Sequence, residues 1–317
     1  MATASQLKSL IKAHYEGDEI RFTTISLQIA AHESKIGHLT FADDIRKIID
    51  KSKQRVPKLK SFNKDFEGLL LEDIPIHKLS DLIVSEAISE RIKRIINEYI
   101  QADKLRRHNL QNRRKILLSG PPGTGKTMTA SILASELKLP LYTILMDKMV
   151  TKFMGETSAK LRQVFDIIQE RQGVYLFDEF DAIGTNRGKD NDVGEMRRVL
   201  NAFLQFIERD NSNSLIVAAT NNLELLDQAL FRRFDDVLHY QLPSNEEKIM
   251  LLDNRLGRYR GNYNLKSIAD VLNGLSHAEI SQACLDSIKE TILTDKNKVD
   301  KQLIIKMIED RKSAYNK

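Results

Sequence analysis

The sequence is poor in cysteine, has no tryptophan and contains no long apolar run, and these shortages exclude several classes of protein. The single cysteine, Cys284, cannot form an internal disulfide, so a domain held together by disulfides is excluded. No apolar run approaches the ~18 residues of a membrane-spanning helix, and no membrane span is expected. Residues 1–19 lack the continuous apolar segment and the small-residue cleavage site of a secretory leader. The expected location is therefore the cytoplasm.

Two hydrolase motifs are missing as well. His32-Glu33 is followed by Ser34, Lys35 and Ile36, so the H-E-x-x-H zinc pattern is absent, and no G-x-S-x-G elbow occurs. If this protein feeds a degradation pathway, the peptidase must be a separate chain.

The net charge of +5 is concentrated in two basic stretches. One run contains Lys51, Lys53, Arg55, Lys58, Lys60 and Lys64 without an acid, and a second stretch covers residues 91–115. Such stretches could attract nucleic acid, but a solvated linker and a solvated helix face explain them as well. We favour the interpretation that these stretches are a solvated linker and a solvated helix face, and we do not expect nucleic acid as the partner.

The 317 residues are enough for two or three domains, each with its own core. Apolar residues at helical spacing predict a small all-α domain over residues 1–56, and Pro57 opens a basic linker over 57–73. Residues 74–243 alternate helical stretches with short apolar runs, and residues 244–317 read as a helical domain. The capping boxes that begin at Ser244 and Ser276 each open a helix there.

The apolar runs of the middle segment predict the fold class. They are KILLSG, LYTIL, GVYLF, SLIVAA and DVLHYQL. Strands separated by helices imply crossover connections and hence a parallel sheet, so we expect an α/β domain whose sheet is sandwiched by helices.

The run KILLSG leads directly into GPPGTGKT, residues 120–127, and then into a helical stretch. This strand, loop and helix order is the context that a G-x-x-x-x-G-K-T phosphate loop requires, and a chance Gly-Pro turn is the weaker reading. Glycines let successive backbone N–H groups point at phosphates. We expect Lys126 to reach the β- and γ-phosphates of ATP and Thr127 to reach Mg²⁺. The residues expected to line the ATP site here are Pro122, Gly123, Thr124, Gly125, Lys126, Thr127 and Met128.

A second motif supports the first. GVYLFDEF, residues 173–180, is an apolar strand that ends in Asp178 and Glu179. Asp178 is expected to hold the Mg²⁺ water shell, and Glu179 to polarise the water that attacks the γ-phosphate. The pair predicts hydrolysis of ATP in addition to binding.

With these motifs in place, the chain from about Leu79 onward resembles the AAA family of P-loop ATPases, within the AAA+ superfamily, and is similar to katanin, spastin and the proteasomal ATPases. SLIVAATNN, residues 214–222, resembles the family's fourth strand with its sensor asparagine, which implies that Asn221 positions the attacking water. LDQALFRRFD, residues 226–235, resembles the arginine-finger segment, which implies that Arg232 and Arg233 reach the ATP of a neighbouring subunit in a homo-oligomer, a hexamer in this family. The usual Gly of that segment is missing.

The same resemblance covers two further segments. GLSHAEI, residues 274–280, is similar to the family's G-x-S-G-A-D-I turn, with His277 in place of Gly, and it lacks the arginine that clamp loaders and Clp-type unfoldases carry near this point. The family holds adenine near the start of the domain, which implies Asp81, Leu82 and Ile83 as base contacts.

TKFMGET, residues 151–157, lies where AAA proteins that thread polypeptides carry an aromatic pore loop. The resemblance implies a substrate-gripping loop of Lys152, Phe153, Met154 and Gly155, because an aromatic side chain grips an extended chain without regard to sequence. The alternative is a Phe153 packed under the following helix.

Three functions stay open on the sequence. The first is a ring ATPase that remodels, unfolds or disassembles a protein substrate. The others are a nucleotide-switched assembly protein and a DNA-associated AAA+ loader. Some bacterial AAA proteins of similar size pair with a separate subtilisin-like protease, and residues 1–56 weakly resemble a three-helix substrate adaptor. A separate protease or adaptor is thus one expected type of partner.

Overall fold

The computed structural model describes residues 8–10, 12–13, 19–38, 40–45, 47, 49, 68–149, 156–183, 192–222 and 231–315. Its contacts divide the chain into two units, Met1–Asn63 and Lys64–Lys317, which are described separately. No helix within these ranges is long and apolar enough to cross a membrane.

The first unit is helical in its described residues. Helix α2 (Glu19–Lys35) packs Ile25 and Ile29 against Ala13, and partly buried apolar side chains close this small cluster. Described residues within 8–13 and 40–49 are also helical. The boundary at residue 56 stays a prediction.

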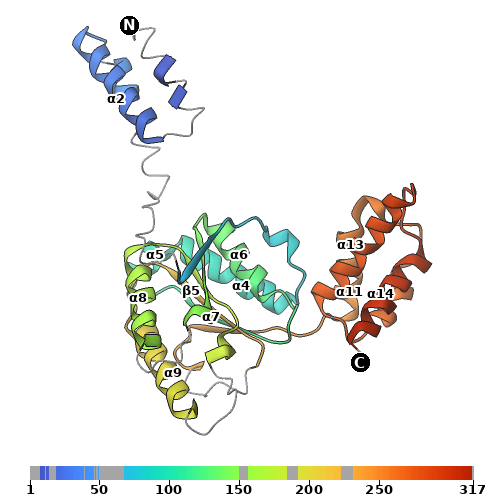
Figure 1. The fold of residues 1–317 in the computed structure, drawn as a ribbon. Coiled ribbons are helices and arrows are strands. Elements are labelled where there is room, and N and C mark those ends of the chain that lie inside the picture. Colours follow the sequence, from blue (N-terminus) through green and yellow to red (C-terminus); the bar gives the residue numbers. More distant parts are fainter. Residues whose placement is uncertain are drawn as a thin grey trace. The chain divides into compact units, whose positions relative to one another are not determined.

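The second unit is built on a six-stranded sheet (Figure 1). Its strands are β1 (Leu70–Asp73), β2 (Lys115–Ser119), β3 (Leu141–Ile144), β4 (Val174–Phe177), β5 (Leu215–Thr220) and β6 (Asp236–His239). The order across the sheet is β1-β3-β4-β5-β2-β6, and every pairing is parallel except the one between β1 and β3. The sheet confirms the predicted α/β class.

Strand β1 corrects one expectation. Its residues fall in the segment 57–73 that was expected to be linker, but Leu70 pairs with Ile144 and Asp73 with Leu141 in an antiparallel ladder. Leu69 and Leu70 are buried, which provides the driving force for this pairing. The basic residues before this short apolar run obscured it in the sequence, and Leu70–Asp73 belong to the sheet and not to a linker.

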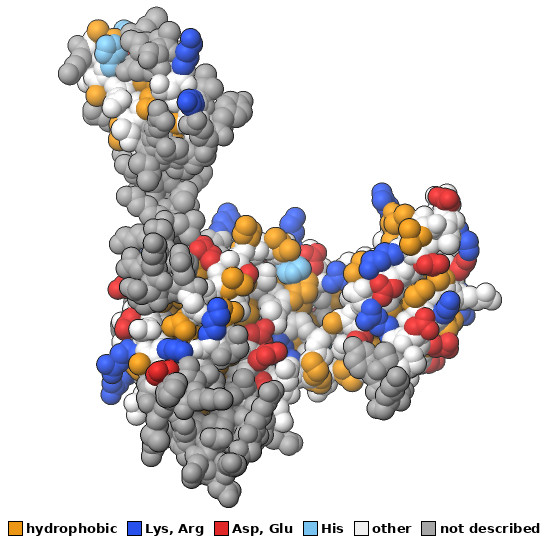
Figure 2. All heavy atoms as spheres, viewed as in Figure 1, with side chains coloured by type: hydrophobic (Ala, Val, Ile, Leu, Met, Phe, Trp, Pro, Cys, Tyr) orange, Lys and Arg blue, Asp and Glu red, His pale blue; other side chains and the backbone are white. Residues whose placement is uncertain are grey.

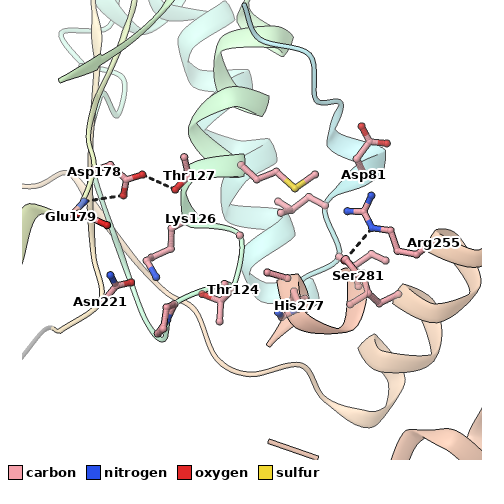
Figure 3. A pocket seen from close by; sticks show the side chains of 18 residues that line it. Asp81, Thr124, Lys126, Thr127, Asp178, Glu179, Asn221, Arg255, His277 and Ser281 are labelled. Carbon is pink, nitrogen blue, oxygen red and sulfur yellow. Dashed lines mark hydrogen bonds between the residues drawn. The ribbon is translucent and has the colours of Figure 1, made fainter. Parts of the chain in front are cut away.

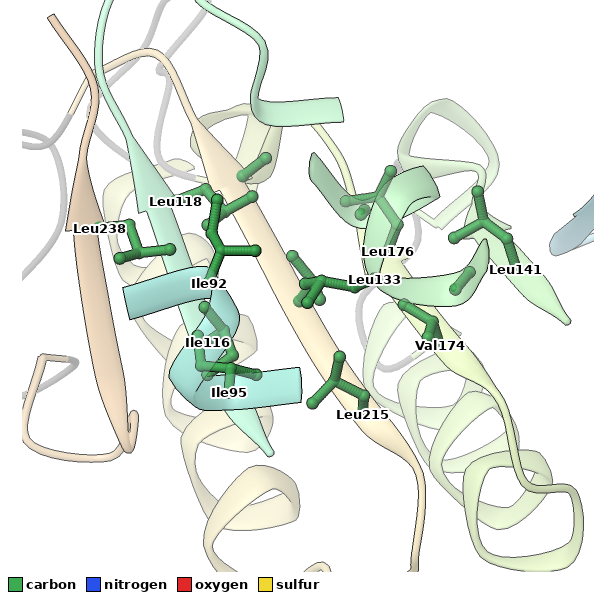
Figure 4. Close-up of a cluster of buried hydrophobic side chains, with 14 of the residues drawn as sticks. Ile92, Ile95, Ile116, Leu118, Leu133, Leu141, Val174, Leu176, Leu215 and Leu238 are labelled. Carbon is green, nitrogen blue, oxygen red and sulfur yellow. The ribbon is translucent and has the colours of Figure 1, made fainter. Parts of the chain in front are cut away.

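One face of the sheet is covered by α4 (Glu86–Ile100) and α6 (Lys126–Leu137) (Figure 4). Ser85 caps α4 by accepting a hydrogen bond from the backbone N–H of Ile88. Ile88, Ile92 and Ile95 then recur at helical spacing and are buried against the sheet. A short helix, α5 (Ala102–Arg106), leads on toward β2. This layer fixes β2 and α6, the two elements that flank the phosphate loop.

The opposite face packs against α8 (Glu156–Glu170) and α9 (Asp192–Arg209), and α7 (Met146–Met149) with the 3-10 turn η2 (Phe180–Ile183) completes this side. Three phenylalanine rings surround Phe203 of α9. The ring centroid of Phe203 lies 5.8 Å from Phe165, 5.1 Å from Phe177 and 4.5 Å from Phe180. Since Phe177 ends β4, this cluster supports the strand end at which Asp178 begins.

Phe203→Ala should destabilise the second unit strongly. The ring is fully buried, so its removal leaves a cavity and should lower the free energy of unfolding by ~3–5 kcal/mol. In a domain of this size the loss corresponds to a fall in melting temperature of roughly 6–20 °C. Phe206→Ala on the same helix is the matched control, because Phe206 stacks on Phe165 but is only half-buried. Equal melting temperatures for the two variants would contradict this account of the core.

After Pro243 the described elements are helical. They are α11 (Asn245–Leu256), η4 (Gly257–Tyr259), α12 (Lys266–Ala269), η5 (Asp270–Leu272), α13 (His277–Leu293) and α14 (Lys301–Tyr315). Both predicted capping boxes are present. Ser244 accepts from the N–H of Glu247, and Ser276 from that of Glu279, while each glutamate accepts from the N–H of its serine. The apolar core of this helical lid includes Ile83, which precedes α4 in the chain.

Candidate nucleotide site

The phosphate loop joins β2 to α6 and depends on glycine at two positions. Gly120 has a φ of 143°, and a Cβ there would lie 2.2 Å from the carbonyl oxygen of Tyr240. Gly123 has a φ of 73°, and a Cβ there would lie 2.6 Å from Oγ of Ser276. Both the backbone conformation and the space forbid a side chain. The two glycines therefore let the backbone of the loop pack closely against Tyr240 and Ser276, as a compact phosphate-binding loop requires.

Lys126, the first residue of α6, lies along the inside of this loop. Its Nζ donates hydrogen bonds to the carbonyl oxygens of Gly120 (2.7 Å) and Pro121 (2.8 Å), and the residue is only 6% exposed. Burial lowers the pKa of the ammonium, while the carboxylates of Asp178 and Asp181 act in the opposite direction. A phosphate would favour the charged form and replace two neutral acceptors by an anionic one.

Asp178 and Thr127 meet beside the loop. Oγ1 of Thr127 donates to Oδ2 of Asp178 at 2.7 Å, and Oδ1 of Asp178 accepts from the backbone N–H of Glu179 at 2.9 Å (Figure 3). A hydroxyl and a carboxylate are hard oxygen ligands, and Mg²⁺ is commonly held by one or two such groups together with waters and substrate phosphates. The two residues fit that role. Among the described residues no group of three or more His, Cys, Asp or Glu side chains could hold a metal.

Glu179 has an unusual backbone. Its φ is 50°, a left-handed conformation that costs a residue with a side chain roughly 1–2 kcal/mol. The side chain is exposed and lines the same cavity as Asn221, which directly follows β5. The backbone N–H of Asn221 donates to Asp181 at 3.3 Å. Because β5 lies between β4 and β2, Asn221 is placed between the acidic strand end and the phosphate loop.

These residues line one end of a cavity of about 460 Å³. The structure brings together in it every residue expected from the phosphate loop, Pro122 to Met128, as well as Asp178, Glu179 and Asn221. Asp81, Leu82 and Ile83 line it too, and Figure 3 shows Asp81 at the end away from Asp178. A cavity of this size is typical of small-molecule sites.

The lid supplies lining residues that the sequence did not reveal. They are Leu251, Arg255, His277, Ala278 and Ser281. The backbone N–H of Ala278 donates to the carbonyl oxygen of Gly123 at 2.9 Å, so α13 begins directly against the phosphate loop. Burial lowers the pKa of the His277 imidazole, which favours its neutral form at neutral pH. The only available signal was the i, i+4 spacing of Leu251 and Arg255, which places both on one face of α11.

Two groups of expected residues are not among the described residues that line this cavity. Arg232 and Arg233 are exposed and do not line it, and the guanidinium of Arg233 forms an ion pair with Glu208 of α9. The expected pore-loop residues, Lys152, Phe153, Met154 and Gly155, lie outside the described residues.

Comparisons with known proteins agree with this geometry. Residues 116–242 match the model of the ATPase family associated with various cellular activities (AAA). The chain is 32% identical over 317 residues to an uncharacterized AAA family ATPase of Sinorhizobium fredii, covering 98% of this chain and 96% of the relative. It is 27% identical to a proteasome-activating nucleotidase of Methanoregula boonei, over 78% of this chain and 59% of that relative. It is 33% identical to an ATP-dependent zinc metalloprotease FtsH of Mycoplasmopsis synoviae, over 67% of this chain and 34% of that relative.

Proposed function

The chain belongs to the AAA family of ATPases, and from this premise we propose that it forms a homo-oligomeric ring, a hexamer, that unfolds or disassembles proteins by threading them through its centre. The observation that carries the ring is the composition of the nucleotide cavity. Among the described residues that line it, the only arginine is Arg255 of the lid, at the end away from Glu179. Charge that develops on the γ-phosphate would need an arginine from elsewhere. Arg232 and Arg233, exposed on the surface, are suited to enter a neighbour's site.

Within one subunit, side chains at the phosphate end of the cavity have distinct roles in hydrolysis. The loop N–H groups and Lys126 would bind the phosphates, and Thr127 and Asp178 would hold Mg²⁺, which would neutralise phosphate charge. Glu179 accepts a hydrogen bond, and then a proton, from the attacking water, and Asn221 orients that water. The strained backbone at Glu179 is consistent with a position fixed for chemistry.

The threading step is supported by the sequence and by the relatives. Phe153 between Lys152 and Met154 gives the aromatic, apolar character that can hold an extended chain. The names of two relatives, proteasome-activating nucleotidase and ATP-dependent zinc metalloprotease, connect ATP with proteolysis in those proteins. This chain lacks the H-E-x-x-H and G-x-S-x-G motifs, so we propose a separate protease or an adaptor as a partner, recruited through residues 1–56.

The described residues on the face shown in Figure 2 give no support to nucleic acid as the cargo. On the face shown in Figure 2, described acidic and basic side chains are interspersed over the second unit. A groove that binds the phosphate backbone of a nucleic acid would instead be lined mainly by basic side chains.

Phe153→Ala tests the threading role. If Phe153 grips substrate, the variant should keep its melting temperature, ATP binding, ring assembly and basal hydrolysis, while remodelling of a protein substrate falls steeply. Phe153→Tyr is the matched control. It keeps the aromatic side chain and adds a hydroxyl, which a water-filled pore tolerates and an apolar core does not. It should remodel almost normally.

Two outcomes would contradict threading by Phe153. A loss of ~3–5 kcal/mol of stability in Phe153→Ala would identify a core residue. An intact hexamer of Phe153→Ala that still remodels substrate would rule out the gripping role of Phe153.

A further inference from the structure

The cavity has a phosphate end and a nucleoside end. Lys126, Thr127 and Asp178 gather at the first and fix where a triphosphate binds. A nucleotide bound in this way extends its base and ribose toward the opposite end, where Asp81 and Arg255 lie (Figure 3). Helices α11 and α13 line the cavity through Leu251, Arg255, His277, Ala278 and Ser281, and Figure 3 shows Arg255 and Ser281 at this opposite end. The nucleoside is thus met by the lid as well as by the segment that contains Asp81.

Arg255 differs from other arginines of the lid in its partners. Arg260 pairs with Asp253, and Arg311 pairs with Asp286. Among the described residues, Nε of Arg255 donates a hydrogen bond to Oγ of Ser281 at 3.2 Å, and this partner is not an acid. A guanidinium has five N–H donors and no acceptor. Arg255 is half-buried at the cavity wall, so a ligand in the cavity can accept hydrogen bonds from its other donors in place of water.

The pairing with Ser281 also orients the group. Ser281 lies on α13 and Arg255 on α11, so the hydrogen bond ties two lid helices at the cavity wall (Figure 3). It uses Nε and leaves the terminal fork of Nη groups available. Such a planar fork can donate to ring nitrogens and ribose oxygens, and it can also stack on an aromatic base.

We propose that Arg255 is a specificity-determining residue that binds the nucleoside part of ATP through its guanidinium, with Ser281 as the residue that positions it. This inference rests on the proposed nucleotide site but is independent of ring assembly and threading. It predicts that Arg255 contributes to binding of the base and ribose and contributes nothing to binding of the phosphates.

The test compares Mg–ATP with Mg–tripolyphosphate, which has the phosphates but no nucleoside, by isothermal titration calorimetry of the full chain. Arg255→Met keeps the apolar stem of the side chain and should weaken ATP binding at least about tenfold, the effect expected from losing one hydrogen bond from a charged donor. Binding of tripolyphosphate should not change. Ser281→Ala should shift ATP binding in the same direction by a smaller factor.

Three variants serve as controls. Arg258→Met removes an exposed lid arginine that does not line the cavity and should bind both ligands normally. Arg255→Lys keeps the charge without the fork, so it should also bind ATP more weakly, and it decides the matter if Arg255→Met does not fold. Lys126→Ala should lose both ligands, and ATP binding as tight as normal in that variant would refute the nucleotide site itself.

The proposal is overturned by normal ATP affinity in a folded Arg255→Met or Arg255→Lys variant. It is also overturned by an equal weakening of ATP and tripolyphosphate, because such a change would show that Arg255 acts on the phosphates or on the lid as a whole.

Discussion

Glu179→Gln should bind ATP with nearly normal affinity and hydrolyse it ~10²–10⁴ times more slowly. The substitution removes the charge that polarises the attacking water but keeps the size of the side chain. It leaves the phosphate contacts of Lys126 unchanged. Because the backbone N–H of Glu179 bonds to Asp178, and the side chain is exposed, the altered carboxyl should not disturb the fold.

The measurement is steady-state phosphate release, together with ATP binding by calorimetry. Glu170→Gln is the matched control, since Glu170 is an exposed residue at the end of α8 that does not line the cavity, and it should hydrolyse ATP normally. Lys126→Ala should instead lose ATP binding itself. Normal turnover by Glu179→Gln would rule out the role assigned to this carboxylate.

The phosphate end of the site was predictable because local sequence determines it. The run KILLSG becomes β2, its following glycines make the loop, and α6 begins at Lys126. Asp178 and Thr127 are far apart in the chain, but parallel strands bring their carboxyl ends to one edge of the sheet, so their meeting also followed from the predicted topology. The capping boxes at Ser244 and Ser276 were predictable for the same reason, since each involves residues three apart.

The nucleoside end was only partly predictable, because it depends on how the lid packs. The family resemblance pointed to Asp81, Leu82 and Ile83, and these residues line the cavity. No local pattern shows that Arg255 reaches it, since this depends on the packing of α11 against α13 and on the contact of α13 with Gly123. Strand β1 was missed for a related reason. Its pairing with β3 is a non-local contact of a short apolar run at the sheet edge.

Mixing two inactive variants should restore ATP hydrolysis if the arginine fingers act between subunits. Lys126→Ala subunits cannot bind ATP but keep Arg232 and Arg233. Subunits with Arg232→Ala and Arg233→Ala bind ATP but lack the arginines. An arginine finger contributes ~10³–10⁵ in rate, so the arginine variant alone should be nearly inactive, and the Lys126→Ala variant alone should be inactive because it does not bind ATP. Because Arg232 and Arg233 are exposed and do not line their own subunit's cavity, only a neighbour is expected to supply them.

In an equal random mixture, about a quarter of the subunit interfaces would join an intact phosphate loop to intact arginines, and phosphate release should rise toward that fraction of the normal rate if the finger acts in trans. The matched control replaces the Lys126→Ala subunit by one that also carries Arg232→Ala and Arg233→Ala, and this mixture should stay inactive. Co-purification through two different tags establishes that mixed assemblies form. If they form and the first mixture remains inactive, the arginines do not act on a neighbour's ATP, and the argument for a ring from the composition of the cavity fails with them.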